Sequence, residues 1–249
     1  MAIIWQKKVK QDFYQVSKAG NSVRLYSNGV FHSQYNPTHL LSHSIWDMLL
    51  LPAFFLPANS VKRILLMGVG GGTVIKLLHR YLQPVDITGV EINPVHLQVA
   101  RKFFKVNQNE ADLICADAIQ WIKQYKGPKF DVIIDDMFGH AGGDINRAVV
   151  LDKSWFNILN RNLNPDGVVV INTTERNTLR DSAFFHDSHT RKQFNSMYTL
   201  RHPRYDNIVG AFFKQTVSKQ NLNKTLMMLG NKKLQNAVFK MDYCLKRMV

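Results

Sequence analysis

An apolar run that ends in glycines and leads into a helical pattern constrains this chain more than any other feature. Residues 64–73 read Ile-Leu-Leu-Met-Gly-Val-Gly-Gly-Gly-Thr, and a second apolar run ends in Glu91. This order of strand, glycine loop, helix and acid-tipped strand is typical of α/β nucleoside sites. Glycines let a ligand approach the backbone where a Cβ would clash, and the carboxylate can accept both ribose hydroxyls. The sequence therefore predicts a ligand with an adenosine-like half.

From residue 62 onward, apolar runs alternate with segments of helical spacing. We expect strands at residues 63–67, 85–90, 111–115, 130–134 and 168–172, and helices at 73–81, after 93, after 117 and at 152–163. Five β–α units in series predict an α/β fold with a doubly wound, Rossmann-like parallel sheet. Ligands of such sheets lie beyond the carboxyl ends of the strands, so the polar residues that follow the strands should meet at one edge.

The two ends of the chain follow other patterns. Residues 12–35 alternate apolar and polar side chains around Asn28-Gly29, which predicts a β-hairpin, and residues 39–56 have helical spacing. We expect a helix at 181–197, a strand pair at 197–203 and 208–214, a Gly-rich loop at 137–147, and an amphipathic helical tail without strands. The expected parts are a small N-terminal β region plus helix (1–58), a Rossmann-like catalytic domain (59–215) and a basic helical tail (216–249).

The chain carries a net charge of +14, and half of it lies at the C-terminal end, in the tail and in Lys214 just before it. From residue 214 onward, eight Lys and Arg face one Asp, a net charge of +7. Such a surface favours nucleic acid, another polyanion or an acidic partner, and it equally serves solubility. The sequence contains no membrane-length apolar run, no secretory cleavage pattern, and no metal-like or disulfide spacing of its two cysteines. We therefore expect a cytoplasmic protein without membrane contact.

Three motifs together resemble a class I S-adenosylmethionine-dependent methyltransferase site. They are the glycine loop, Gly-Val-Glu-Ile-Asn-Pro at 89–94 and Ala116-Asp117-Ala118. The resemblance implies that the loop, with Gly68, Gly70, Gly71 and Gly72, passes the amino-acid end of the cofactor. It also implies that Glu91, followed by Ile92, holds the ribose. Asp117 would bind the adenine amino group, and the backbone N–H of Ala118 would meet the adenine ring.

The chain resembles the spermidine synthase (polyamine aminopropyltransferase) family more closely, over roughly residues 20–215. The likeness rests on the hairpin at 23–30, the helix through Trp46-Asp47-Met48, the segments 64–73, 90–94 and 116–118, and Phe-Asp-Val-Ile-Ile-Asp-Asp at 130–136. The resemblance implies transfer of a 3-aminopropyl group from decarboxylated S-adenosylmethionine to a diamine. It also implies a small N-terminal β domain before a Rossmann-like domain, commonly in dimers or tetramers.

The sequence departs from that family at three positions. The synthases have an Asp in the glycine loop that faces the ammonium of the decarboxylated cofactor, and Gly71 stands there in this chain. A second acid, which helps to bind the polycation, falls on Gly139, and His32 lies about where the family uses Gln. A site without the acid at Gly71 tolerates a cofactor that keeps its own carboxylate, namely S-adenosylmethionine. A dicationic amine desolvated in a pocket needs matched carboxylates, so a basic chain that lacks two of them suits putrescine poorly.

The candidate catalytic residues follow the fourth expected strand. Asp136 is the candidate base for an amine nucleophile, with Asp135 beside it. Adjacent strand residues point opposite ways, so one of the two should face the site. His32, His140 and Tyr205 are candidates for the acceptor pocket. The alternative is a solvated strand end for the two acids, an exposed loop histidine for His140 and an ordinary turn for Tyr205.

Three functions remain open from the sequence. The first is methyl transfer from S-adenosylmethionine to an unknown small-molecule acceptor, which the losses at Gly71 and Gly139 favour. The second is aminopropyl transfer from decarboxylated S-adenosylmethionine. The third is a non-catalytic relic that binds an adenosyl ligand or a partner, against which Glu91, Asp117 and Asp136 argue. We expect no metal, and we expect a homodimer.

Overall fold

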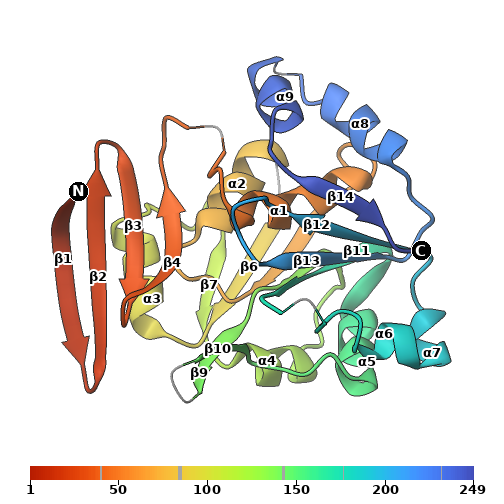
Figure 1. The fold of residues 1–249 in the computed structure, drawn as a ribbon, viewed down its shortest axis with the longest axis horizontal. Helices are drawn as coiled ribbons and strands as arrows, with labels where there is room; N and C mark the ends of the chain where they lie inside the picture. Colours follow the sequence, from red (N-terminus) through yellow and green to blue (C-terminus); the bar gives the residue numbers. More distant parts are fainter. Residues whose placement is uncertain (40, 84–85, 142–143, 176, 231) are drawn as a thin grey trace.

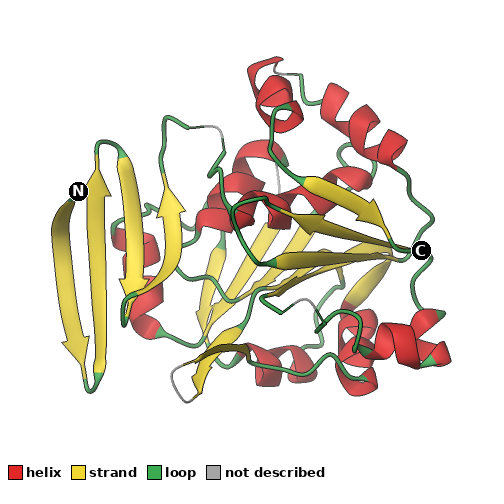
Figure 2. Cartoon of the chain, viewed as in Figure 1, coloured by secondary structure: helices red, strands yellow, loops and turns green. Residues whose placement is uncertain are grey.

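A mixed eight-stranded sheet forms the centre of the molecule, and a separate four-stranded sheet lies at the N-terminus (Figures 1 and 2). The computed structural model describes residues 1–249 except 40, 84–85, 142–143, 176 and 231. In the described part of the chain, no helix has both the length and the apolar character needed to span a bilayer.

The central sheet has the order expected of a Rossmann-like methyltransferase fold. Its strands, from one edge to the other, are β14 (Cys244–Arg247), β12 (Ser196–Arg201), β13 (Ile208–Phe213), β11 (Leu163–Thr173), β8 (Phe130–Asp135), β5 (Arg63–Met67), β6 (Asp86–Glu91) and β7 (Asp112–Cys115). The strands from β11 to β7 are parallel, whereas β13, β12 and β14 each pair antiparallel with their neighbours. The predicted α/β fold with a doubly wound sheet is thus confirmed.

Helices cover both faces of this sheet (Figure 2). One apolar core joins it to α1 (Ile45–Leu50), the 3₁₀ turn η1 (Leu51–Phe55), α2 (Thr73–Tyr81) and α3 (Pro94–Lys102). A second core, on the opposite face, joins it to α4 (Ala118–Gln124) and α5 (Lys153–Asn162). Side chains that accept hydrogen bonds from first-turn N–H groups begin three of these helices, namely Asn93 for α3, Asp117 for α4 and Asp152 for α5.

The N-terminal sheet is an antiparallel meander of β1 (Ala2–Val9), β2 (Asp12–Ala19), β3 (Ser22–Ser27) and β4 (Val30–Tyr35). The predicted turn at Asn28-Gly29 joins β3 and β4, and both residues have positive φ, 50° and 80°. The sequence did not predict β1. Six of its eight residues are exposed, so it lacks the apolar alternation of a half-buried strand.

Several predicted elements differ in the structure. The helix expected over 39–56 is only α1 followed by η1, because Pro52 disfavours a continued α-helix. The loop expected at 137–147 contains the hairpin β9 (Phe138–Ala141) and β10 (Asp144–Arg147). The helix expected at 181–197 is two single turns, α6 (Ala183–His186) and α7 (Ser188–Arg191), with Asp187 ending one and capping the other.

The C-terminal tail was predicted to be entirely helical, and this is wrong for its last residues. It forms α8 (Lys219–Met227) and α9 (Lys232–Phe239), but residues 244–247 become β14 because the outer edge of β12 is open to pairing. Leu222, Leu226 and Val238 are buried in the same core as α1 and α2. The division of the chain at residues 58 and 215 remains a proposal.

Candidate functional site

A cavity of about 530 Å³ lies between the N-terminal sheet and the carboxyl ends of the central strands. Most of the residues predicted for the site line it: Gly68, Gly70, Glu91, Ile92, Asp117, Ala118, Asp136, His32 and Tyr205. Phe31 of β4 and Trp46 of α1 add aromatic side chains to its wall, with ring centroids 5.3 Å apart. Gly71, Gly72 and Asp135 were predicted for the site but do not line the cavity.

The glycine loop lies directly against the strand end that carries Asp136. Gly68 has φ +87°, and a Cβ on it would overlap the carbonyl oxygen of Asp136. A Cβ on Gly70, which has φ +54°, would lie 2.8 Å from Ser33 Oγ. These two positions need glycine because their φ is positive and because Ser33 of β4 and the backbone of Asp136, directly after β8, lie so close to the loop.

Gly71 faces a closed space instead of the cavity. A Cβ there would lie 2.7 Å from the Phe104 ring and 2.8 Å from the Cβ of Ser33. Its backbone N–H donates to Ser33 Oγ at 2.7 Å. Phe104 and Ser33 therefore fill the space into which an acidic side chain at this position would extend. Gly72 caps α2 with φ +88°, and Val106 is the nearest neighbour to a Cβ there.

Glu91 is a buried carboxylate that receives three backbone hydrogen bonds. Its Oε2 accepts from the N–H groups of Val69 at 3.0 Å and Gly70 at 2.9 Å, and its Oε1 accepts from Asn93 at 2.9 Å. His96 Nδ1 lies 3.8 Å from Oε2. Burial alone would raise the pKa of Glu91, but His96 and the backbone donors outweigh it and hold the pKa below its ordinary value. Glu91 is therefore ionised near neutral pH and joins β6 to the glycine loop.

The adenine-side candidates lie where the next strand ends. Asp117 Oδ1 accepts from the N–H groups of Ile119 at 2.8 Å and Gln120 at 3.2 Å, which caps α4. Ala118 is buried at the first position of that helix, and Ile92 is 68% exposed on the cavity rim. An exposed carboxylate beside apolar surface suits a planar base that carries an amino group.

The two adjacent aspartates at the end of β8 have different environments. Asp135 is fully buried, forms an ion pair with Arg147 at 2.6 Å, and accepts from Trp155 Nε1 at 3.0 Å. Asp135 is the acid that faces away from the cavity, but it is fully buried, whereas the second acid was expected to cap a helix or meet solvent. Because its carboxylate is committed to Arg147 and Trp155, we withdraw it as a catalytic candidate.

Asp136 is the acid that faces the cavity. Its Oδ1 accepts from Asn172 Nδ2 at 2.7 Å. Burial is the main cause that raises its pKa, to about 7, and the hydrogen bond from Asn172 opposes the rise. The charges of Asp135 and Glu91 add to the rise, and that of Arg147 opposes it. A carboxyl group with this pKa can accept a proton at neutral pH.

The three acceptor-pocket candidates have different outcomes. His32 lines the cavity from β4, with its ring 4.8 Å from that of His96. Tyr205 lines it from the turn before β13. The backbone of His140 belongs to β9, but its side chain lies outside the described part of the structure. A Cβ on Gly139 would meet no atom within 4 Å.

Sequence reasoning missed His96 and Ser44 among the polar residues that line the cavity. It placed Asn172, at the end of the fifth expected strand, on the ligand edge of the sheet but gave it no role. His96 lies at an ordinary helical position after Asn93-Pro94, and no motif distinguishes it. Among the described residues, no group of three His, Cys, Asp or Glu side chains is arranged to hold a metal ion.

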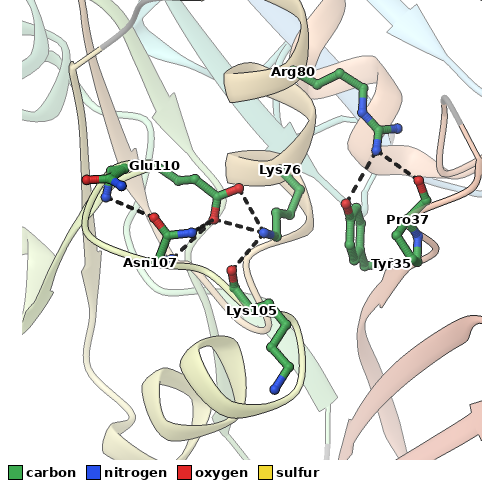
Figure 3. Close-up of polar contacts among 8 residues, drawn as sticks. Tyr35, Pro37, Lys76, Arg80, Lys105, Asn107 and Glu110 are labelled. Carbon is green, nitrogen blue, oxygen red and sulfur yellow. Dashed lines mark hydrogen bonds and ion pairs between the residues drawn. The ribbon is translucent and has the colours of Figure 1, made fainter.

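Two cations of α2 anchor the helix that follows the glycine loop (Figure 3). Lys76 Nζ lies 2.8 Å from both carboxylate oxygens of Glu110 and from the carbonyl oxygen of Lys105. Arg80 donates to the Tyr35 hydroxyl at 3.3 Å and to the Pro37 carbonyl at 3.2 Å. The helix is thus bound to the Rossmann-like part on one side and to the chain after β4 on the other.

Comparison with known proteins links this geometry to a family. A family model described as the spermine/spermidine synthase domain matches residues 46–225. A polyamine aminopropyltransferase of Chromobacterium violaceum is 32% identical over 122 residues, which cover 48% of this chain and 45% of that protein. The chain therefore spans about half the length of this curated relative.

The chain is similar to two further proteins, one in structure and one in sequence. The structure of a probable spermidine synthase from Corynebacterium glutamicum superimposes with a TM-score of 0.71 at 18% identity, covering 99% of this chain and 91% of that one. An eEF1A lysine and N-terminal methyltransferase homolog of Drosophila melanogaster is 30% identical over 79 residues, 30% of this chain and 12% of that protein. The structural match establishes the fold alone, and the relatives' names include two kinds of transferase.

Proposed function

Because the chain belongs to the spermine/spermidine synthase family, we propose that it transfers an alkyl group from an S-adenosyl sulfonium donor to an amine acceptor. The observation that carries this proposal is Asp136. It lies on the cavity against the glycine loop, and its pKa is raised to about 7. A carboxyl group that titrates near neutral pH can take the proton that an ammonium must lose before its nitrogen attacks.

The proposed reaction asks three things of this chain. Glu91 accepts hydrogen bonds from the ribose hydroxyls, and Asp117 accepts one from the adenine amino group. Asp136 removes a proton from the acceptor ammonium. The freed nitrogen lone pair attacks the carbon bonded to the sulfonium, and the C–S bond breaks to leave a neutral thioether. The sulfonium carbon is already activated, so alignment of the two reactants supplies much of the rate.

We infer that aminopropyl transfer from decarboxylated S-adenosylmethionine is the leading reaction. The relative from Chromobacterium violaceum is named for it, and the family model carries the synthase description. The charged side chains that line the described cavity also fit cationic ligands. Apart from two histidines they are Glu91, Asp117 and Asp136, with no Lys or Arg, in a chain of net charge +14.

One observation favours methyl transfer as a second candidate. At Gly71, where the synthases place an acid toward the donor's ammonium, Phe104 and Ser33 occupy the space. A donor that still bears its own carboxylate needs no such acid. The cavity therefore receives no acid from this position for the ammonium of the decarboxylated donor, and intact S-adenosylmethionine would deliver a methyl group.

Calorimetry with the full chain tests the donor, and mass spectrometry of the products tests the reaction. Decarboxylated S-adenosylmethionine, S-adenosylmethionine and methylthioadenosine are titrated separately, and each donor is then incubated with putrescine. We expect the decarboxylated form to bind most tightly and an aminopropylated diamine to appear. Tighter binding of S-adenosylmethionine with a methylated product would select the second candidate. If none of the three adenosyl compounds binds, the chain is no transferase and the proposal fails.

Three further expectations belong to this proposal. Dimers or tetramers are common in the family that the sequence resembles, and we expect a homodimer here. Both cysteines are exposed free thiols, which suits a reducing cytoplasm. The exposed lysines of α8 and α9, Lys219, Lys224, Lys232 and Lys233, and Lys240 directly after α9 support contact of the tail with a polyanion.

A further inference from the structure

A chain of two amides ends on the carboxylate of Asp136. Asn207, in the turn before β13, donates from Nδ2 to Asn172 Oδ1 at 3.1 Å. Asn172, near the end of β11, donates from Nδ2 to Asp136 Oδ1 at 2.7 Å. All three residues line the cavity, so the chain runs along its wall from the antiparallel to the parallel part of the central sheet.

The carboxylate of Asp136 determines which end of the Asn172 amide faces it. An asparagine amide can present either its oxygen or its nitrogen after a half-turn about its terminal bond. Because an ionised carboxylate can only accept, the NH₂ group of Asn172 faces Asp136, and its oxygen is left to accept from Asn207. The opposite orientation would place an amide oxygen against a carboxylate oxygen.

The backbone of Asn172 is held as firmly as its side chain. Arg147 Nη1 donates to the Asn172 carbonyl oxygen at 2.5 Å, and its other terminal nitrogen forms the 2.6 Å ion pair with Asp135. On its other side, β11 pairs with β13, with Asn172 opposite Val209. The amide donor is therefore fixed relative to β8, β10 and β13 together.

We propose that Asn172 is a positioning residue for Asp136 and that Asn207 restrains its amide by donating to the amide oxygen. The proposal deepens the proposed function, on which it rests, because it assigns how the base is aimed. Asn172 engages Oδ1, which leaves Oδ2 of Asp136 to receive the proton of an acceptor ammonium. The donated hydrogen bond also favours the ionised form, so it counteracts part of the effect of burial.

Other charges face Asp136 from the surrounding elements. Asp135 of β8 and Glu91 of β6 disfavour its ionised form, and Arg147 of β10 favours it. The remaining titratable groups of the cavity wall are His32, His96, Asp117 and Tyr205. The test must therefore measure the titration of Asp136 itself, because the pH dependence of activity alone would combine the titrations of all these groups.

The titration of Asp136 can be measured directly. Side-chain carboxyl ¹³C NMR of aspartate-labelled full-length protein gives its midpoint, with the signal assigned from its absence in Asp136→Asn. We expect Asn172→Ala to raise the midpoint by about one pH unit, since one hydrogen bond to the ionised form is lost. Asn207→Ala should shift it in the same direction by less, because the Asn172 amide becomes free to turn.

Asn162→Ala is the matched control. Asn162 is a buried amide of α5 that donates to the carbonyl oxygens of Ile158 and Ile122, and it does not line the cavity. Its loss lowers stability like that of any buried hydrogen-bonded amide, and we expect the Asp136 midpoint to stay in place. A shift of the same size in this variant would show that general loosening, not the Asn172 bond, moves the midpoint, and would overturn the proposal.

The proposal is also overturned if Asn172→Ala and Asn207→Ala both fold, by circular dichroism, and both keep the original midpoint. If Asn172→Ala does not fold, Asn207→Ala alone decides. With an amine that the wild type alkylates, kcat/KM is measured against pH. The fall of kcat/KM on the acid side should have the same midpoint as the NMR titration of Asp136 in each variant. Absence of turnover with every amine would defeat the proposed function, while the NMR shifts would still support the role of Asn172.

Discussion

In each half of the cavity, one carboxyl group has a shifted pKa, and the two shifts have opposite directions. In the glycine-loop half, Glu91 accepts three backbone hydrogen bonds, and its pKa lies below its ordinary value. In the strand-end half, Asp136 accepts one bond from a side-chain amide beside the buried Asp135, and its pKa rises to about 7. Both carboxyl groups belong to the same cavity wall, so their surroundings and not their burial alone decide which one titrates.

The difference shows how the fold divides binding from proton transfer. His96 and the backbone N–H groups together keep Glu91 charged, and the backbone donors cannot turn away from it. A single side-chain donor leaves Asp136 only partly compensated for burial. The first arrangement suits recognition of a neutral ribose, and the second suits a base that must gain and lose a proton.

Removing the base should have the largest effect. We expect Asp136→Asn to lower kcat about 100- to 10,000-fold, the usual contribution of a general base. The amide keeps the size of the side chain but cannot accept a proton. Donor affinity, measured by calorimetry, should change little because the donor is assigned to the other half. A large loss of donor affinity with kcat unchanged would contradict the division.

Removing the binding carboxylate should have a smaller effect of another kind. We expect Glu91→Ala to weaken donor binding about 10- to 100-fold, since hydrogen bonds to a charged group are lost. The N–H groups of Val69 and Gly70 also lose their acceptor, so the glycine loop loosens. At saturating donor, kcat should stay closer to wild type than in Asp136→Asn. Unchanged donor affinity in calorimetry would remove Glu91 from the binding site.

The elements of the parallel part of the central sheet could be predicted from the sequence, because apolar runs, glycines and helix caps lie within each element. Helix α2 has the predicted bounds, and Asn93 and Asp117 cap the helices that follow them. Elements that depend on distant partners were missed. Strand β14 forms because the edge of β12 is open to pairing. The end of the predicted loop at 137–147 is held against the central sheet by the ion pair between Arg147 and Asp135.

The candidate site shows the same limit. The residues that follow strands could be listed from the sequence, and most of them line the cavity. The sequence could not tell which of Asp135 and Asp136 faces it, because that depends on contacts with Arg147, Trp155 and Asn172 from three other elements. Gly71 was read correctly as a position without an acid, but only the structure reveals that Phe104 closes the space.

The two halves should also give stability opposite dependences on pH, which is the smallest effect expected. The folded-state pKa of Asp136, about 7, exceeds its ordinary value of 3.8, so the folded protein binds this proton more tightly. The stability that follows is present below about pH 4 and is lost as the pH rises toward 7. Compared with wild type, Asp136→Asn should therefore gain roughly 1 to 2 kcal/mol between pH 5 and pH 8 in urea unfolding.

Glu91→Gln supplies the opposite comparison within the same measurement. The folded-state pKa of Glu91 is lowered, so its contribution to stability is full above its ordinary pKa and fades as the pH falls through the folded value. The deficit of Glu91→Gln should thus be constant from pH 6 to 8 and shrink in acid, where Asp136→Asn differs least from wild type. Parallel pH curves for the two variants would mean that one electrostatic environment covers the whole cavity, and the contrast between its halves would be lost.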